Sequence, residues 1–267
     1  MIVGGAGAVG AVTGRARQVA RASGFLGVTA LMLPAFLARM AATSDADRDA
    51  VRDVWVARWA RALLRLFAVE VVVEGVVPPP TQGRGRGRLV VTNHRSAVDI
   101  GVVLSTFGGT MVSRADLATW PVLGPAARSV GTVFVDRSNA KSGAATIREI
   151  QKLLEGGQTI NLFPEGTTFD GDEVRPFHGG AFVSAVRAES EILPVGVAYP
   201  RASGAAFVYE PFTAHLARMS KGGATRMAIA VGTPFIARRS DRATDITKRA
   251  QAEVQAQVAI ARARCGP

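Results

Sequence analysis

A histidine and an aspartate stand close together in the chain, immediately after an apolar run. His94 and Asp99 lie in the segment 93–99, which follows residues 89–92. Chemistry in α/β proteins gathers at the carboxyl ends of strands. Imidazole titrates near neutral pH and removes a proton from a reacting group when a carboxylate orients it. The pair is therefore a candidate general base with its orienting partner, although a purely structural hydrogen-bonded pair fits the local spacing equally well.

Three later segments also place polar groups at the expected ends of strands. Residues 131–137 end in Asp136 and Arg137, residues 161–167 contain Glu165 in a Pro/Gly turn, and residues 193–196 contain a proline. An arginine offers a planar pair of donors that suits a phosphate group. Each segment also has a simpler interpretation, as a surface ion pair, a packed turn or an edge-strand breaker.

The elements that must position these groups alternate between strands and helices. Runs rich in β-branched residues and bounded by turn residues predict strands at 69–73, 89–92, 110–113, 132–135, 159–163, 192–198 and 226–231. Apolar residues at helical spacing predict a helix that ends near Gly156 and a last one at about 241–264. The fold class is therefore α/β, with a mixed β-sheet flanked by helices over residues 69–267.

The first 68 residues differ from this body. The apolar stretch 24–38 is about 15 residues long, shorter than the ~20 that cross a bilayer as a straight helix. The segment 49–68 places three arginines on one helical face and tryptophan, valine and leucine on another, as interfacial membrane helices do. We predict a two-helix membrane-associating motif over residues 1–68. The alternative for the apolar stretch is a signal peptide. The alternative for the second helix is ordinary packing on the protein core.

Composition narrows the partners. The chain of 267 residues has 32 Lys and Arg against 21 Asp and Glu, a net charge of +11. Such a charge suits either nucleic acid or an anionic bilayer surface, and the predicted anchor favours the bilayer. The single cysteine, Cys265, excludes an internal disulfide and a multi-cysteine metal site. Gly5, Gly7 and Gly10 have dinucleotide-binding spacing, but a full preceding strand and the later acidic residue are missing.

Taken in order, the four segments resemble the glycerolipid acyltransferase family, the lysophosphatidic acid acyltransferases above all. Asn93-His94 with Asp99 resembles its first motif, residues 132–137 the second, residues 163–167 the third and residues 193–195 the fourth. Residues 113–117 and 120–124 add to the similarity, which runs from about residue 89 to residue 199. Four ordered motifs make the resemblance specific.

The resemblance implies an activity. A fatty acyl group would pass from acyl-CoA or acyl carrier protein to the free sn-2 hydroxyl group of lysophosphatidic acid, giving phosphatidic acid. His94 would be the general base and Asp99 its orienting carboxylate, without a covalent acyl-enzyme. The family also implies that the acceptor is bound through Arg114, Arg137, Glu165, Gly166 and Thr167.

The resemblance further implies membrane lipids as partners, no nucleic acid, no bound cofactor or metal, and a place at the cytoplasmic face of the inner membrane. Two departures concern the acceptor. Thr168-Phe169 stand where the family commonly has Arg-Ser, and His178 stands where it has Lys. Fewer fixed positive charges weaken the case for a phosphate headgroup, and a lyso-ornithine lipid is the alternative acceptor. A lipid-binding protein without turnover is the non-enzymatic alternative.

Overall fold

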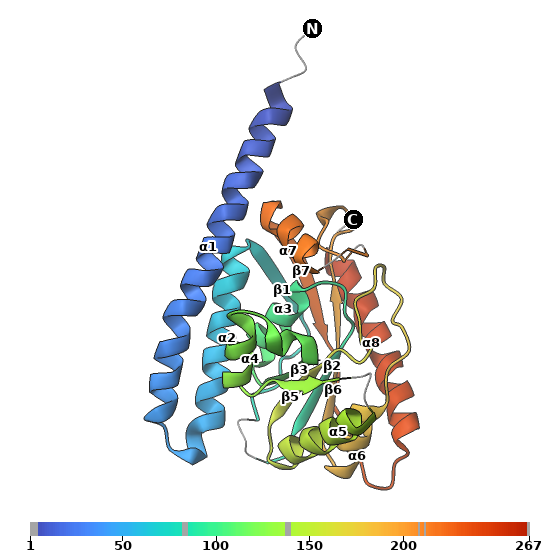
Figure 1. The fold of residues 1–267 in the computed structure, drawn as a ribbon. Coiled ribbons are helices and arrows are strands. Elements are labelled where there is room, and N and C mark those ends of the chain that lie inside the picture. The colour runs from blue at the N-terminus through green and yellow to red at the C-terminus, as the bar shows by residue number, and fades with distance from the viewer. Residues whose placement is uncertain (1–4, 82–84, 137–139, 208, 211, 266–267) are drawn as a thin grey trace.

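The protein is built around one mixed β-sheet with helices on both faces (Figure 1). The computed structural model describes residues 5–81, 85–136, 140–207, 209–210 and 212–265. The order of the strands in the sheet is β1-β7-β6-β2-β5-β3-β4, with β8 paired to β6. The predicted fold class is confirmed.

All seven predicted strands are present. The strands are β1 (Val69–Glu74), β2 (Arg88–Thr92), β3 (Thr110–Arg114), β4 (Val133–Val135), β5 (Thr159–Leu162), β6 (Glu191–Ala198), β7 (Thr225–Val231) and the short β8 (Phe235–Ile236). Strands β6, β2, β5, β3 and β4 pair in parallel, whereas β7 and β8 run antiparallel to β6. The carboxyl ends of β2, β3, β4 and β5 therefore meet at one edge of the sheet, which is where the first three motifs end.

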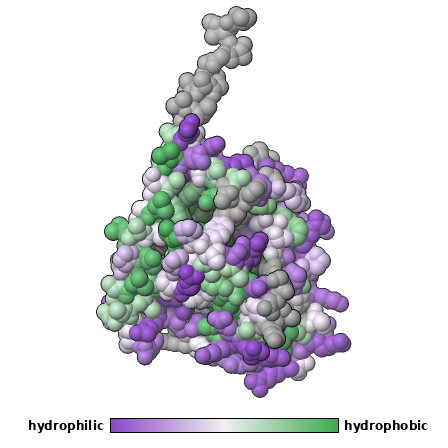
Figure 2. All heavy atoms as spheres, viewed as in Figure 1, coloured by the Kyte–Doolittle hydropathy of each residue, from purple (hydrophilic) through white to green (hydrophobic). Residues whose placement is uncertain are grey.

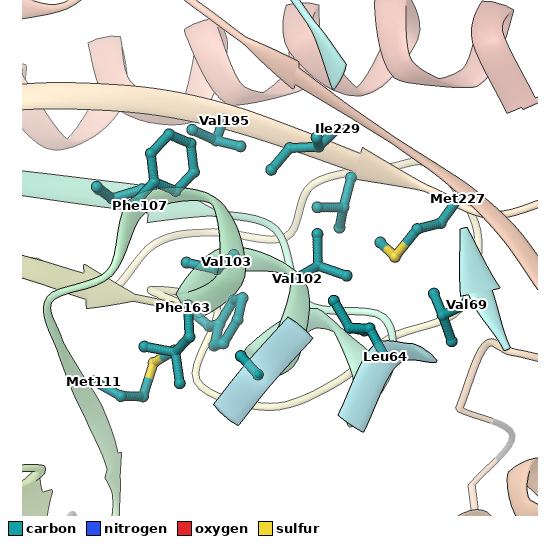
Figure 3. Packing of buried hydrophobic residues seen from close by; sticks show 14 of the residues in the cluster. Leu64, Val69, Val102, Val103, Phe107, Met111, Phe163, Val195, Met227 and Ile229 are labelled. Carbon is teal, nitrogen blue, oxygen red and sulfur yellow. The ribbon is translucent and has the colours of Figure 1, made fainter. Parts of the chain in front are cut away.

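Helices cover the sheet because its central strands are apolar on both faces. The connecting helices are α3 (Val98–Phe107), α4 (Leu123–Ser129), α5 (Ala140–Glu155), α6 (Gly180–Arg187), α7 (Phe212–Lys221) and α8 (Ala243–Cys265). Leu89 and Val91 of β2 pack with α5, α6 and α8, while Val90 between them packs with α3. Figure 3 shows the cluster on the α3 side of the sheet, with Val102 and Val103 of α3 near Val195 of β6. This alternation buries all of β2 and fixes the direction in which residues 93–99 leave the sheet.

The N-terminal segment forms two long helices, α1 (Gly5–Ala41) and α2 (Arg48–Leu66). The prediction of an apolar helix too short to cross a bilayer is wrong. Within α1, the 28 residues Gly14–Ala41 are by length and composition apolar enough to span a membrane, and Pro34 lies inside the helix. Only 11% of its most apolar window is buried against the protein, unlike a core helix. Figure 2 shows the hydrophobic surface that α1 and α2 present on one side of the molecule.

The two helices pack on each other through aromatic side chains. The ring of Phe25 lies 6.3 Å from that of Trp59, and the Trp59 indole donates a hydrogen bond of 3.1 Å to Thr29. Arg21 of α1 is buried and donates to the carbonyl oxygens of Leu66 and Met219, at the carboxyl ends of α2 and α7. These contacts satisfy helix-end carbonyls and attach α1 to the body.

The glycine spacing at the start of the chain has no role in dinucleotide binding that this fold supports. Residues 5–10 are the first turns of α1, whereas the fingerprint needs a strand followed by a tight turn.

Candidate functional site

His94 and Asp99 form a hydrogen-bonded pair at the carboxyl end of β2. The Nδ1 atom of His94 lies 2.8 Å from Oδ2 of Asp99, which belongs to the first turn of α3. The histidine side chain is 16% exposed and the aspartate side chain is fully buried. Among the described residues we find no hydrogen bond to the other ring nitrogen, Nε2. A carboxylate accepts only, so Nδ1 carries the proton and Nε2 keeps the lone pair that a general base needs.

The carboxylate of Asp99 is fixed from every side. Its Oδ2 atom accepts from the backbone N–H groups of Arg95 at 2.6 Å and Ser96 at 2.8 Å. Its Oδ1 atom accepts from the phenol of Tyr199, which follows β6. Burial raises the pKa of Tyr199 well above its usual value, and the neighbouring Asp99 charge adds to this, so the phenol stays a donor. Asp99 cannot turn away from His94 without losing these contacts.

Two further contacts fix the histidine itself. The side-chain amide of Asn93 exchanges two hydrogen bonds with the backbone of Val197, at 3.0 and 2.8 Å, which ties the end of β2 to β6. The imidazole of His94 stacks on the ring of Phe163, with 4.1 Å between centroids and 10° between planes. The end of β5 therefore supports the ring from one face.

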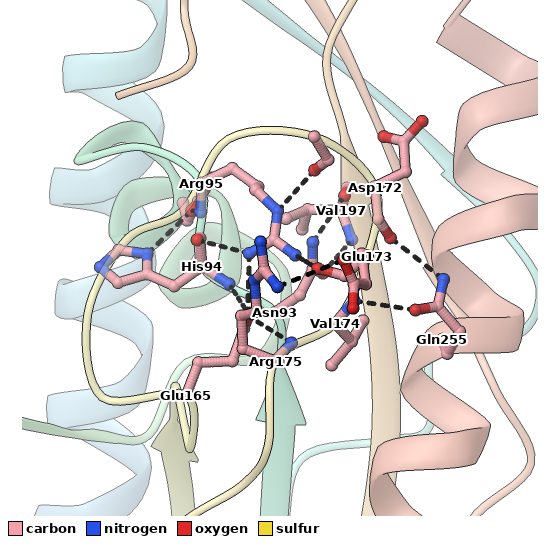
Figure 4. Close-up of polar contacts among 12 residues, drawn as sticks. Asn93, His94, Arg95, Glu165, Asp172, Glu173, Val174, Arg175, Val197 and Gln255 are labelled. Atoms are coloured by element: carbon pink, nitrogen blue, oxygen red, sulfur yellow. Dashed lines mark hydrogen bonds and ion pairs between the residues drawn. The ribbon is translucent and has the colours of Figure 1, made fainter. Parts of the chain in front are cut away.

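Glu165 lies behind this site and binds protein groups. It is buried, and its carboxylate accepts from the backbone N–H of His94 at 2.8 Å and that of Arg175 at 3.0 Å. The guanidinium of Arg95 donates to both carboxylate oxygens, and also to backbone oxygens of the loop 171–173 (Figure 4). Gly166 next to it has φ +83°, a conformation that glycine adopts without strain. The predicted contact between Glu165 and the acceptor remains a prediction, and the structure gives this carboxylate a bracing role.

Arg114 and Thr167, two further predicted acceptor-binding residues, lie at the same edge of the sheet and are exposed. Arg114 at the end of β3 is 70% exposed and pairs with Asp116 at 3.1 Å. Thr167 is exposed in the turn after Gly166. Arg137 lies outside the described residues. Over the described residues, no three His, Cys, Asp or Glu side chains come together as metal ligands.

An apolar cavity of about 280 Å³ lies between the helical pair and the body. Its walls come from α1, α2, α3 and α4, and include Phe25, Trp59, Ala127 and Leu104. Ala97 and Val98 also line it, and they directly follow the turn that holds Asp99. The cavity therefore reaches the turn that holds Asp99 and lies beneath the helices that carry the exposed apolar surface.

Sequence reasoning missed three residues that complete the site. Tyr199 and Arg95 carry no pattern that distinguishes them from other tyrosines and arginines, although Arg95 stands next to His94. His215 of α7 is buried against Ser96. A lone histidine in a helical sequence pattern is a weak signal, because nothing local shows which residues it contacts.

Comparison with known proteins shows the family to which the chain is related. Residues 69–198 match the Acyltransferase family. A lyso-ornithine lipid O-acyltransferase of Pseudomonas aeruginosa is 30% identical over 249 residues, which are 90% of this chain and 93% of that protein. A second, from Brucella abortus, is 33% identical and 73% of its length is matched. A 1-acyl-sn-glycerol-3-phosphate acyltransferase of Neisseria gonorrhoeae is 31% identical, over 50% of this chain and 52% of that protein.

A solved structure shares the whole architecture. The crystal structure of the 1-acyl-sn-glycerophosphate acyltransferase PlsC from Thermotoga maritima superposes with a TM-score of 0.70 at 20% identity, and the match covers 95% of this chain and 100% of that one. The similarity includes the two N-terminal helices as well as the sheet. The chain therefore belongs to the glycerolipid acyltransferase family.

Proposed function

We propose that this protein transfers a fatty acyl group from an acyl thioester to the hydroxyl group of a single-chain lysolipid. The observation that carries the proposal is the His94–Asp99 pair, with Nδ1 bonded to a fixed, buried carboxylate and Nε2 left available. The family membership supplies the reaction class, and the pair supplies the base that this reaction requires.

The proposed chemistry uses the chain's own residues as follows. Nε2 of His94 takes the proton of the acceptor hydroxyl while its oxygen attacks the thioester carbonyl carbon. The tetrahedral intermediate collapses, the carbon–sulfur bond breaks, and the leaving thiolate takes the proton from the imidazolium. Asp99 stabilises the imidazolium between these steps. Base catalysis of this kind contributes ~10²–10⁴ in rate.

The cavity of about 280 Å³ suits an acyl chain. Its walls are almost entirely apolar side chains, so a hydrocarbon gains the free energy of leaving water when it enters. Because Ala97 and Val98 line the cavity and follow the turn that holds His94 and Asp99, a chain whose carbonyl end lies beside them would present its carbonyl group close to His94. We assign the cavity to the hydrocarbon chain of one of the two substrates.

The helical pair supports a place at the membrane. Leu31 is 77% exposed and Leu26 is 52% exposed on a helix long enough to enter a bilayer. Arg58, Arg61 and Arg65 of α2 are exposed and suit anionic lipid headgroups. A membrane-bound enzyme at the cytoplasmic face of the inner membrane, where acyl-CoA and acyl carrier protein occur, remains our proposal.

Two acceptors fit the family, lysophosphatidic acid and a lyso-ornithine lipid, and we favour the lyso-ornithine lipid. Lysophosphatidic acid follows from the order of the four motifs, and it needs cations near His94. A lyso-ornithine lipid is favoured because a protein of that name matches almost the whole chain, whereas the lysophosphatidic acid enzyme of Neisseria gonorrhoeae matches half. The loop after Gly166 also exposes Asp170 and Glu173, and Glu173 pairs with Arg175 at 3.2 Å. Mixed charges of this kind suit a headgroup with both an ammonium and a carboxylate better than a phosphate.

One experiment tests the reaction and the acceptor together. Purified full-length protein in mixed micelles receives labelled acyl-CoA with lysophosphatidic acid, lyso-ornithine lipid or glycerol 3-phosphate in parallel. We expect acylation of a lysolipid, with lyso-ornithine lipid preferred, and loss of that activity in His94→Ala at an unchanged melting temperature. No turnover of any acceptor with either acyl-CoA or acyl carrier protein, or a His94→Ala variant within tenfold of the parent, would refute the proposal.

A further inference from the structure

A second histidine–carboxylate pair lies directly behind the first. His215 of α7 is fully buried, and its Nδ1 atom lies 3.0 Å from Oε1 of Glu210. Its Nε2 atom lies 3.1 Å from the hydroxyl oxygen of Ser96. Ser96 belongs to the turn between His94 and Asp99, so both pairs act on the same few residues.

The neighbours of the His215 ring determine which nitrogen carries the proton. Two groups lie beside Nδ1: Oε1 of Glu210, which only accepts, and Nη2 of Arg218 at 3.1 Å, which only donates. The backbone N–H of Ala97 donates to Nε2, so Nδ1 carries the proton and its N–H donates to Glu210. Nε2 is then the acceptor, and two donors point to it: the hydroxyl of Ser96 and the backbone N–H of Ala97 at 3.4 Å. Burial lowers the pKa of His215, which agrees with a neutral ring.

These contacts end on the groups that bind Asp99. The N–H of Ala97 stands at the amino end of α3, where helical N–H groups lack partners within the helix, and His215 supplies one. The Ser96 hydroxyl accepts from the N–H of Val98 at 3.2 Å, and the Ser96 N–H donates to Asp99. The orientation of the 95–97 backbone therefore depends on the imidazole of His215, which α7 holds in place.

The set of Ser96, His215 and Glu210 has the order of a nucleophilic triad, but Ser96 is not placed as a nucleophile. The Ser96 side chain has no exposed surface, and its hydroxyl already accepts from Val98. A thioester carbonyl has no approach to it. The set is therefore built to hold the turn in place.

We propose that His215 is a positioning residue: with Glu210 it holds Ser96 and Ala97, and through them Asp99, in the geometry that His94 needs as a base. The inference rests on the proposed function, because it concerns the same reaction. It predicts that changes at His215 reduce kcat much more than they change KM for either substrate, since His215 is too deeply buried to contact substrate.

Two variants of His215 form a matched pair for the test. In His215→Gln the amide reaches the place of Nε2 and can still accept from Ser96 and Ala97. In His215→Asn the shorter amide reaches only the place of Nδ1 and retains Glu210 alone. We expect kcat to fall roughly 10- to 100-fold in His215→Asn, as for the loss of one or two hydrogen bonds, and within about fivefold in His215→Gln.

The outcomes separate the two proposals. A parent enzyme without turnover of any lysolipid refutes the proposed function. If the parent is active but His215→Asn and His215→Gln have equal kcat, the positioning role alone is refuted. The same holds if the variants lose activity through a higher KM and not through a lower kcat. Should both variants unfold, Glu210→Gln carries the test, since it keeps the shape and removes the charge that fixes the tautomer. An unchanged kcat in that variant overturns the inference, and a several-fold lower kcat at unchanged KM supports it.

Discussion

Replacing Asp99 by asparagine removes one charge from the site and keeps every atom position. Three N–H groups converge on the Oδ2 atom at 2.6–2.8 Å: the ring Nδ1–H of His94 and the backbone N–H groups of Arg95 and Ser96. The amide of Asp99→Asn must turn its oxygen toward them, because an NH₂ group there would face three donors. Its NH₂ group then faces Tyr199, whose phenol oxygen is able to accept. The tautomer of His94 should therefore be retained.

The expected fall in kcat follows from the interactions that Asp99→Asn retains. In serine proteases the same substitution costs ~10⁴ in kcat because the histidine takes the wrong tautomer. Here the tautomer is retained and only the stabilisation of the imidazolium by the negative charge is lost. We therefore expect kcat to fall roughly 10²-fold, the lower end of what base catalysis contributes. KM for both substrates should stay within about threefold, because Asp99 is fully buried.

The assay is steady-state acyl transfer by the full-length protein, with release of free thiol as the continuous signal. Asp45→Asn is the matched control, since Asp45 is 93% exposed and pairs with Arg48 away from the site. Thermal unfolding of both variants checks that the fold is kept. A kcat for Asp99→Asn within threefold of the parent would show that the charge has no role in the reaction, and the reasoning above would then be wrong.

Three further predictions concern the membrane, the cavity and stability. Leu31→Asp should weaken binding to anionic vesicles at least tenfold in a flotation assay, because burial of one leucine is worth ~1.5–3 kcal/mol. Val76→Asp is the control, since Val76 is exposed on a loop, and it should bind as the parent does. Equal binding of the two variants would contradict the membrane anchor. Ala127→Phe should shift the preferred acyl chain to shorter lengths in a competition assay, because the ring enters the cavity. Ala145→Phe, on the exposed face of α5, should leave the preference unchanged. An unchanged preference in Ala127→Phe would show that the acyl chain does not bind in the cavity. Burial raises the pKa of Asp53 to about 6, so the folded state binds this proton more tightly than the unfolded chain and stability falls as the pH rises through about 6. Asp53→Asn should therefore raise the melting temperature at pH 7 and leave it unchanged at pH 4, and a lower value at pH 7 would contradict this.

Local pattern was sufficient for the elements and for the pair that opens the site. Runs of β-branched residues bounded by turn residues predicted seven strands, because a strand buried on both faces must be apolar along its length. His94 and Asp99 were recognised because only five positions separate them, so one turn at the end of β2 brings them into contact. Apolar periodicity was less informative for α1, whose helix continues beyond the apolar stretch and through Pro34.

Only the tertiary structure decided what surrounds that pair. Tyr199 reaches Asp99 from the end of β6, 100 positions away, and His215 reaches Ser96 from α7, 119 positions away. Glu165 proved to brace His94 and Arg95 from within the protein, although its motif indicated a contact with the acceptor. The sequence alone determined that a histidine and a carboxylate leave a central strand together, because that contact is local. Which groups hold them depends on strand order in the sheet, a long-range property that no local pattern contains.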